Sequence, residues 1–190
     1  MSLFQPDRYF SRITAIDIKG DLLLAGYTNV LLDIDNTLRS RETGDIPRDV
    51  GVWLGKARDA GVRFCLLSNN WHDDVFDFAK GLDLPIVAKA CKPLPFGYLR
   101  AERELGCKRA DTVAIGDQLL TDVVGADLAG IAAYMVMPLV DVDLKHTVAL
   151  RVIERGLLGS REPEPVPAYL TNHVSGAACA APGGNQEGNR

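Results

Sequence analysis

Residues 30–38 read Val-Leu-Leu-Asp-Ile-Asp-Asn-Thr-Leu, an apolar run that ends on two acids separated by one residue. A short apolar run closed by Asp and Asn is typical of a buried strand leaving a sheet. Strand alternation places Asp33 and Asp35 on one side, at the carboxyl end, where open α/β sheets bind ligands. Two carboxylates there can hold a hard cation and divide nucleophile and acid roles. The same spacing also occurs in ordinary turns, so further positions must decide.

Polar residues follow three later apolar runs in the same way. The sequences are Ser68-Asn69-Asn70 after residues 62–67, Lys92-Pro93 after residues 85–88, and Gly116-Asp117 after residues 111–115. Each has an ordinary explanation, as a helix cap, a solvated lysine or a turn residue. Because the carboxyl ends of parallel strands meet at one edge of a sheet, four such positions together are better explained by a shared site.

The segments between these runs have the apolar spacing of helices. Pro47 and the Pro93/Pro95 pair suit helix starts, Asn70 suits an N-cap, and a fourth helix is predicted near residues 120–124. Glycines that suit helix ends follow these patterns at positions 61, 81, 106 and 130. A last strand is expected within residues 129–140. The alternation predicts an α/β fold, a three-layer, Rossmann-like, mostly parallel sheet with right-handed crossovers.

The chain is expected to divide into three parts. These are an N-terminal segment, residues 1–27, packing on the core, with one or two helical turns in residues 8–25; an α/β domain, residues 28–159, closing with a helix over 140–158; and a tail, residues 160–190. The tail is rich in Pro, Gly and Ala, and it is expected to be disordered because it cannot bury enough apolar surface to offset its ordering entropy.

The composition is that of an ordinary globular protein, with 47% hydrophobic and 24% charged residues among 190. A net charge of −4 argues against nucleic acid as the main partner. The four cysteines (Cys65, Cys91, Cys107 and Cys179) form no CxxC pair, which favours reduced thiols in a cytoplasmic chain. Cys91 is expected to be a small buried apolar residue. No secretory signal is recognised at the N-terminus, and the longest apolar stretch, residues 129–140, is too short to span a bilayer.

As a set, the four strand-end positions resemble the four motifs of the haloacid dehalogenase (HAD) superfamily. The sequences Ser68-Asn69-Asn70, Lys92-Pro93 and Gly116-Asp117-Gln118-Leu119-Leu120-Thr121-Asp122 are similar to those of its capless YqeG-like branch, the subfamily IIIA phosphatases. The resemblance extends from about Pro6 to about Gly159. It implies a HAD-like phosphatase without a cap domain. One branch of this group includes fungal mitochondrial enzymes that dephosphorylate phosphatidylglycerophosphate, so the resemblance also implies a lipid as one candidate substrate.

The resemblance implies roles for the acids. Asp33 would be the nucleophile that forms an aspartyl-phosphate, and Asp35 the general acid and later the base that activates water. Asp117 would complete a Mg²⁺ site with Asp33 and the backbone carbonyl of Asp35. Asp122 would orient the metal ligands without binding the metal itself, or it would bind as an outer ligand.

It also implies roles for the residues that bind phosphate. Ser68 would donate its hydroxyl to the phosphate, and the backbone N–H of Asn69 would assist, together with those of Ile34 and Asp35. Lys92 would place a fixed positive charge beside the nucleophile and the phosphate, serving both binding and catalysis.

Other classes of protein fit the sequence less well. A dehalogenase would not need a second carboxylate at Asp35, and the transport ATPases of the superfamily carry Thr there. A phosphorelay receiver domain would place its phospho-accepting Asp after a later strand, whereas the Asp33-x-Asp35 pair follows the first. A non-catalytic scaffold that kept the fold is the competitor from another class. It is disfavoured by the intact set of Asp33, Asp35, Ser68, Lys92 and Asp117.

The sequence does not identify a single substrate. Residues 39–46 and 70–91 leave no room for a folded cap, so an open site would suit a lipid head group at the inner membrane face or a phosphoprotein, with a soluble phosphate ester as the alternative. Arg39 and Arg41 would meet a second phosphate or be solvated. Aromatic residues near the N-terminus would contact a membrane or pack in the core: Phe4, Tyr9 and Phe10. The oligomeric state is not predicted.

Overall fold

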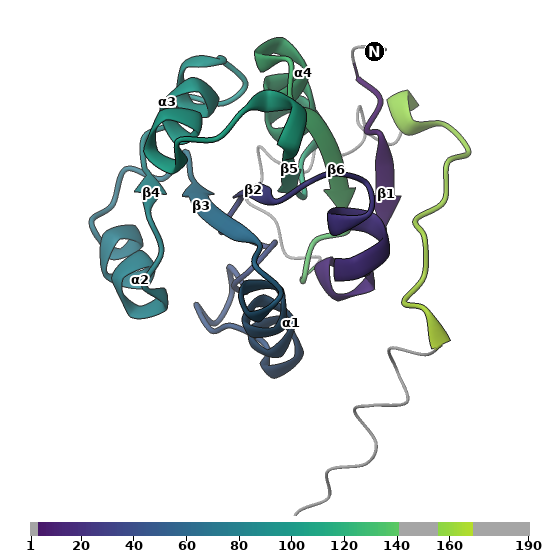
Figure 1. Ribbon diagram of the computed structural model, residues 1–190, viewed down its shortest axis with the longest axis horizontal. Helices are drawn as coiled ribbons and strands as arrows, with labels where there is room; N and C mark the ends of the chain where they lie inside the picture. The colour runs from purple at the N-terminus through teal and green to yellow at the C-terminus, as the bar shows by residue number, and fades with distance from the viewer. Residues whose placement is uncertain (1–3, 141–155, 169–190) are drawn as a thin grey trace, which may run out of the picture.

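A six-stranded sheet runs through the computed structural model, which describes residues 4–140 and 156–168 (Figure 1). Its strands lie in the order β1-β6-β5-β2-β3-β4, and every pairing between them is parallel. The strands are β1 (Arg8–Phe10), β2 (Asn29–Leu32), β3 (Arg63–Leu67), β4 (Ile86–Val87), β5 (Thr112–Gly116) and β6 (Ala132–Val136). The predicted α/β class and parallel sheet are confirmed.

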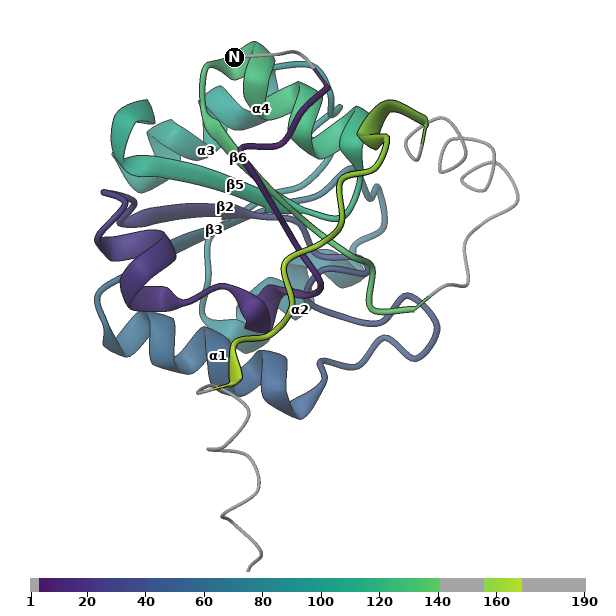
Figure 2. The same cartoon turned by 90° about the vertical axis from the view of Figure 1, so that its right-hand side faces the viewer.

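Helices cover both faces of the sheet, which makes the three predicted layers. They are α1 (Arg48–Asp59), α2 (Asp74–Leu82), α3 (Phe96–Leu105) and α4 (Val124–Ala129). Figure 2 shows α3 and α4 on one side of the sheet and α1 and α2 on the other. No folded cap stands between β2 and α1 or between β3 and α2, where the described chain has only loops.

The apolar strands are buried on both faces, as expected for a parallel sheet between two helical layers. In β2, Val30 and Leu32 belong to the core cluster that includes Trp53 of α1, whereas Leu31 belongs to the cluster that includes Tyr98 of α3. The same alternation holds in β3, β5 and β6. This two-sided burial explains why the sequence shows continuous apolar runs rather than alternating ones.

The N-terminal segment combines the predicted helical turns with a strand that was not predicted. Short helical segments at Ile13–Ala15 and Ile18–Leu23 bury apolar side chains against the core, as expected. Before them, β1 (Arg8–Phe10) adds an edge strand beside β6. The strand has three residues, too few for a periodic pattern, so only its pairing partner defines it. Phe10 lies in the core at 1% exposure, which decides between its two expected roles.

The beginning of the predicted disordered tail is ordered in the structure. Glu164 pairs with β1 through backbone bonds, because its N–H donates to Tyr9 O and its carbonyl accepts from Ser11 N, at 2.7 and 2.8 Å. Arg161 donates to Pro6 O at 2.7 Å. The prediction is therefore wrong for residues 160–168, which find hydrogen-bond partners on an exposed sheet edge. Residues 169–190, and most of the helix predicted over 140–158, lie outside the described residues.

Helix boundaries differ from the prediction in two places. α2 begins at Asp74 rather than after Asn70, whose side chain instead accepts from His72 N in a turn at 2.9 Å. Gly81 lies within α2, and Asp83 takes the left-handed position that ends it, at φ 53°. The other three glycines do lie just past helix ends with positive φ, as predicted: Gly61, Gly106 and Gly130.

Candidate active site

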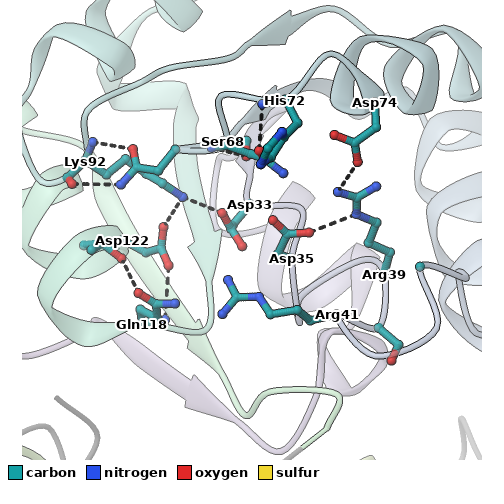
Figure 3. Close-up of a pocket in the computed structure, with 15 residues that line it drawn as sticks. Asp33, Asp35, Arg39, Arg41, Ser68, His72, Asp74, Lys92, Gln118 and Asp122 are labelled. Atoms are coloured by element: carbon teal, nitrogen blue, oxygen red, sulfur yellow. Dashed lines mark hydrogen bonds and ion pairs between the residues drawn. The ribbon is translucent and has the colours of Figure 1, made fainter. Parts of the chain in front are cut away.

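A cavity of about 620 Å³ opens at the carboxyl edge of the sheet (Figure 3). Its lining comes from the loops that follow β2, β3, β4 and β5: Asp33, Asp35, Arg39, Ser40, Arg41, Gly44, Ser68, Asn69, Asn70, His72, Asp74, Lys92, Gln118, Thr121 and Asp122. The four sequence-predicted segments therefore meet at one place. Loops and helix starts surround the cavity, and the described chain places no domain over it.

Three carboxylates gather at the base of this edge. Each of Asp33, Asp117 and Asp122 offers an oxygen, and these three oxygens lie within 4.8 Å of one another. All three side chains are nearly or fully buried. Asp117 was predicted to lie beside Asp33, and it does. Asp122 was expected to orient the site or to bind as an outer ligand. Its carboxylate oxygen lies within the same 4.8 Å of the oxygens of Asp33 and Asp117.

Lys92 supplies the cation that faces this acidic group. Its Nζ donates to Asp33 Oδ1 at 2.5 Å and to Asp122 Oδ1 at 2.6 Å, and its side chain is only 3% exposed. The backbone of Lys92 is held by the Asn69 side chain, which accepts from Lys92 N at 2.7 Å and donates to Lys92 O at 2.9 Å. The Asn69 side chain thus fixes the lysine loop. Its predicted contact with phosphate through the backbone N–H stays a prediction.

The close approach of Asp122 depends on a glycine at the end of β5. A Cβ on Gly116 would lie 2.3 Å from Asp122 Cγ, so any side chain there would displace the carboxylate. Asp122 is also held from the other side, because Gln118 N donates to its Oδ2 at 3.1 Å. Sequence analysis did not assign a role to Gly116. A glycine closing a strand beside an acidic loop is the signal that could have indicated it.

Tyr98 of α3 also holds the segment that carries Asp122, a short π-helical stretch at Leu119–Val123. Its hydroxyl donates to Asp122 O at 2.9 Å and is 3.2 Å from Thr121 O. The Tyr98 ring packs against Gly125 of α4. A Cβ on Gly125 would lie 2.6 Å from the ring, so this contact requires glycine. Burial raises the pKa of Tyr98 well above its ordinary value, which keeps the hydroxyl protonated as a donor. Sequence analysis did not single out Tyr98.

Asp35 lines the cavity but stands apart from the three clustered carboxylates. Its Oδ1 accepts from Arg39 Nε at 2.9 Å, within a tight turn in which Asn36 has φ 65°. Arg39 is therefore engaged and largely buried, and neither expected role, a second phosphate or solvation, describes its position. Arg41 lines the cavity, and Figure 3 shows its side chain extending beneath Asp33 and Asp35.

Ser68 is placed at the cavity wall with its hydroxyl partly engaged. Its Oγ accepts from Asn70 N at 3.0 Å, and the residue is 2% exposed. A hydroxyl that accepts one bond keeps its proton for donation. This arrangement is compatible with the predicted donation to a phosphate.

Burial dominates the electrostatics of the site. Burial raises the pKa of Asp33 to about 7, against the lowering effect of Lys92, and Asp122 adds to the rise. Burial also lowers the pKa of Lys92, but the adjacent Asp122 and Asp33 more than offset this, so that its pKa is raised. The lysine is therefore firmly charged. Lys92 thus pairs with two of the three buried carboxylates, Asp33 and Asp122.

The donor set suits a hard divalent cation. Carboxylate oxygens are the preferred protein ligands of Mg²⁺ and similar ions, which retain several waters. The group of Asp33, Asp117 and Asp122 brings such oxygens together, and two of its members, Asp33 and Asp122, line the open cavity. A cation there would lower the pKa of Asp33. Participation of the Asp35 carbonyl stays a prediction.

Cys91 differs from its expected position. The loop buries Ala90 and Lys92 and exposes the Cys91 side chain between them. Cys65, in contrast, is a buried core thiol whose pKa is raised by burial. Cys91 thus belongs to the outer surface beside the cavity and not to the core.

Comparison with known proteins agrees with this geometry. The family model described as HAD-hydrolase-like matches residues 90–138, the part that carries Lys92, Asp117 and Asp122. A curated relative from Bacillus subtilis (strain 168), "Probable phosphatase YqeG", is 31% identical over 157 residues, which cover 83% of this chain and 91% of the relative.

Two solved structures share the fold. One is a protein from Streptomyces avermitilis MA-4680 assigned to the HAD family of hydrolases, with 15% identity, a TM-score of 0.50, and coverage of 82% of this chain and 78% of that chain. The other is an uncharacterized protein from Listeria monocytogenes serotype 4b, with 16% identity, a TM-score of 0.50, and coverage of 62% and 85%. At these identities they show the α/β fold alone.

The fold is that of the HAD-like hydrolases. Identity and coverage over most of both chains show that this chain belongs to that superfamily, within the YqeG-like phosphatases.

Proposed function

We propose that this protein is a Mg²⁺-dependent phosphomonoesterase that works through an aspartyl-phosphate on Asp33. The observation that carries the proposal is the position of Asp33: its carboxylate is bound by Lys92 and grouped with Asp117 and Asp122 at the wall of an open cavity. Membership among the YqeG-like phosphatases supports the same reaction class.

In the first half of the reaction, a carboxylate oxygen of Asp33 attacks phosphorus in line with the ester oxygen. The bond from phosphorus to the leaving oxygen breaks, and Asp35 donates a proton to that oxygen. Lys92 and the Ser68 hydroxyl stabilise the charge on the non-bridging oxygens. A divalent cation bound by Asp33, Asp117 and Asp122 would supply further neutralisation of that charge.

In the second half, the ionised Asp35 accepts a proton from a water molecule that attacks phosphorus. The bond between phosphorus and Asp33 breaks, inorganic phosphate leaves, and both carboxyl groups return to their starting states. The geometry favours this division of roles, because Lys92 binds Asp33 whereas Asp35 lies outside the acidic cluster and contacts Arg39 in the loop after β2 (Figure 3).

A lipid phosphate such as phosphatidylglycerophosphate is the proposed substrate. The open cavity accepts a bulky leaving group, and large apolar side chains are exposed on the neighbouring loops and at the start of α3: Trp71 at 65%, Leu94 at 50% and Phe96 at 66%. Arg41 lines the cavity, which supports its proposed contact with a second phosphate. In the described residues no helix has the length and apolar character to cross a membrane.

A soluble phosphate ester or a phosphoprotein is the alternative substrate for the same site. It is favoured by the polar lining of the cavity itself. A non-catalytic scaffold is the remaining alternative. The grouping of three buried carboxylates speaks against it, because burying them is costly and a fold without catalysis would gain nothing from keeping them together.

The first test is hydrolysis of p-nitrophenyl phosphate with Mg²⁺ and with EDTA. Asp33→Asn, nearly isosteric, should lower turnover by about 10⁴-fold or more with little change in melting temperature, as expected when a covalent nucleophile is lost. Asp83→Asn is the matched control, since Asp83 lies at the end of α2 with its side chain 98% exposed. Wild-type turnover in Asp33→Asn would refute the nucleophile assignment.

The second test compares substrates. Phosphatidylglycerophosphate in mixed micelles should give a kcat/KM orders of magnitude above that of glycerol phosphate, because binding of the non-reacting lipid is used in the transition state. Arg41→Ala should reduce the lipid reaction more than that of p-nitrophenyl phosphate. Equal efficiency on glycerol phosphate would contradict the lipid proposal and leave the general phosphatase proposal intact.

A further inference from the structure

Arg39 connects the flap after β2 to helix α2 through three contacts. Its Nε donates to Asp35 Oδ1 at 2.9 Å, and its Nη2 donates to Asp74 Oδ2 at 3.0 Å. Its guanidinium carbon lies 5.0 Å from the centre of the Phe78 ring, in the range of a cation–π contact. The side chain is only 12% exposed. A surface arginine that merely balanced charge would not be held on three sides.

The backbone around Asp35 makes this contact local and rigid. Arg39 N donates to Ile34 O at 3.0 Å, and Arg39 O accepts from Asn36 N at 2.8 Å. Asp35 and Arg39 also form an isolated parallel bridge. The chain therefore returns on itself directly after Asp35, and the arginine reaches the carboxylate from this return. Figure 3 shows Asp35 between Asp33 and Arg39, facing the cavity.

We propose that Arg39 is a positioning residue for Asp35. It binds Oδ1 of the carboxylate, so that Oδ2 is the oxygen held toward the leaving group and later toward water. Asp74 and Phe78 of α2 in turn fix the guanidinium, which makes the orientation of the acid depend on a helix that carries none of the reacting groups. An arginine fork suits this role better than lysine, because its planar geometry sets direction as well as charge.

The proposal rests on the proposed function, since it concerns the same reaction. It predicts a particular kinetic pattern. If Arg39 acts through Asp35, its loss should matter most for esters whose leaving oxygen needs a proton. Misplacement of a reacting group by about 1 Å can cost on the order of 10²-fold in rate. Binding of the phosphate itself, which does not involve Asp35 Oδ1, should change little.

The test compares phenyl phosphate, with a poor leaving group, and p-nitrophenyl phosphate, with a good one. Arg39→Met keeps the length of the side chain against Phe78 but loses the fork. It should lower kcat on phenyl phosphate by roughly 10- to 100-fold and on p-nitrophenyl phosphate by much less, with KM nearly unchanged. Arg39→Lys should recover part of the loss. Arg58→Met, in the last turn of α1, is the control and should leave both reactions unchanged.

A double variant separates positioning from general structural damage. Asp35→Asn combined with Arg39→Met should be no slower than Asp35→Asn alone, because the arginine has nothing left to position. Asp74→Asn, which loosens only the outer anchor, should show the same leaving-group pattern to a smaller extent. This variant keeps the test informative if Arg39→Met does not fold.

Three results would overturn the proposal. They are an equal loss on both esters, a rise in KM that indicates direct contact of Arg39 with the phosphate, and a double variant in which the two losses multiply. Each can be distinguished from failure of the proposed function, which would instead appear as wild-type activity in Asp33→Asn.

Discussion

Lys92 and Arg8 each bridge two acids that are distant in the sequence, but the two cations lie in very different surroundings. Lys92 binds Asp33 and Asp122 at the carboxyl edge of the sheet, where all three side chains are at most 11% exposed. Arg8 binds Asp21 and Glu164 at the β1 edge, where the side chains are 34%, 16% and 44% exposed. The same chemical grouping thus occurs once in the interior and once at the surface.

The energetic consequences differ accordingly. Solvent screens the charges around Arg8, so these pairs contribute little stability beyond fixing the direction of the chain. Around Lys92, a third buried acid, Asp117, brings a carboxylate oxygen within 4.8 Å of those of Asp33 and Asp122. Burying an ion costs several kcal/mol unless it is well paired. Three acids grouped in the interior therefore indicate a functional site, whereas a screened cluster at an edge indicates attachment of a chain segment.

Among the variants that test this comparison of the two cations, Lys92→Met should have the largest effect, because it removes the cation from the buried cluster. Turnover should fall by about 10³-fold or more, because fixed charge at the reacting phosphate is lost. Without divalent metal, the free energy of unfolding should fall by roughly 3–5 kcal/mol, the usual result of leaving buried charges unpaired. Urea unfolding in EDTA measures this change. An unchanged unfolding free energy would contradict the view that the lysine offsets the acids.

Divalent metal should act in the same direction as the lysine. Mg²⁺ at 100 times its dissociation constant should stabilise the protein by about 2.7 kcal/mol, because binding to the folded state alone shifts unfolding. Asp122→Asn should weaken this stabilisation. Urea unfolding with Mg²⁺ and with EDTA measures the effect, and Arg8→Met is the control, since it should leave the metal response unchanged. A metal response that survives Asp122→Asn in full would remove Asp122 from the site.

Gly116→Ala should separate catalysis from folding more clearly. The new Cβ would lie 2.3 Å from Asp122 Cγ, so the carboxylate must move away from Lys92. We expect kcat to fall by roughly 10²-fold and the unfolding free energy by about 1–3 kcal/mol. Gly55→Ala in α1 is the matched control, because nothing lies within 4 Å of the added Cβ there. Equal activity in the two variants would show that the position of Asp122 is not critical.

The comparison also explains what the sequence could predict. Asp33, Ser68, Lys92 and Asp117 each follow an apolar run, and parallel strands bring such positions together by topology alone. The central strands and the location of the site therefore follow from local patterns. The central place of Asp122 does not, because it depends on the missing side chain of Gly116 and on a turn whose geometry no spacing rule specifies.

The β1 edge was missed for a different reason. Arg8 and Glu164 are separated by 156 positions, and neither segment has an apolar periodicity of its own. The three-residue strand β1 acquires its structure from pairing with β6, and the extended segment around Glu164 acquires its structure from pairing with β1. The Pro-rich composition correctly indicated a segment without its own core, but it gave no information about the exposed edge that could bind it.

The smallest expected effects concern this edge. A chain ending at Gly159 loses the backbone bonds that Glu164 makes to Tyr9 and Ser11 and the bonds of Arg161 to the N-terminus. Each hydrogen bond contributes about 1 kcal/mol net, and less where solvent competes. We therefore expect the free energy of unfolding to fall by about 1–2 kcal/mol and kcat on p-nitrophenyl phosphate to stay unchanged.

The variant Glu164→Gln should lower the free energy of unfolding by less than about 1 kcal/mol, because only the screened ion pair is removed while the backbone pairing persists. Calorimetry at low and high salt distinguishes the two contributions: the truncation loss should be insensitive to salt, whereas the Glu164→Gln loss should shrink as salt rises. A truncation with no loss of stability would show that the segment contributes nothing to the fold, and a large loss of activity would show that the two edges are coupled through the sheet rather than independent.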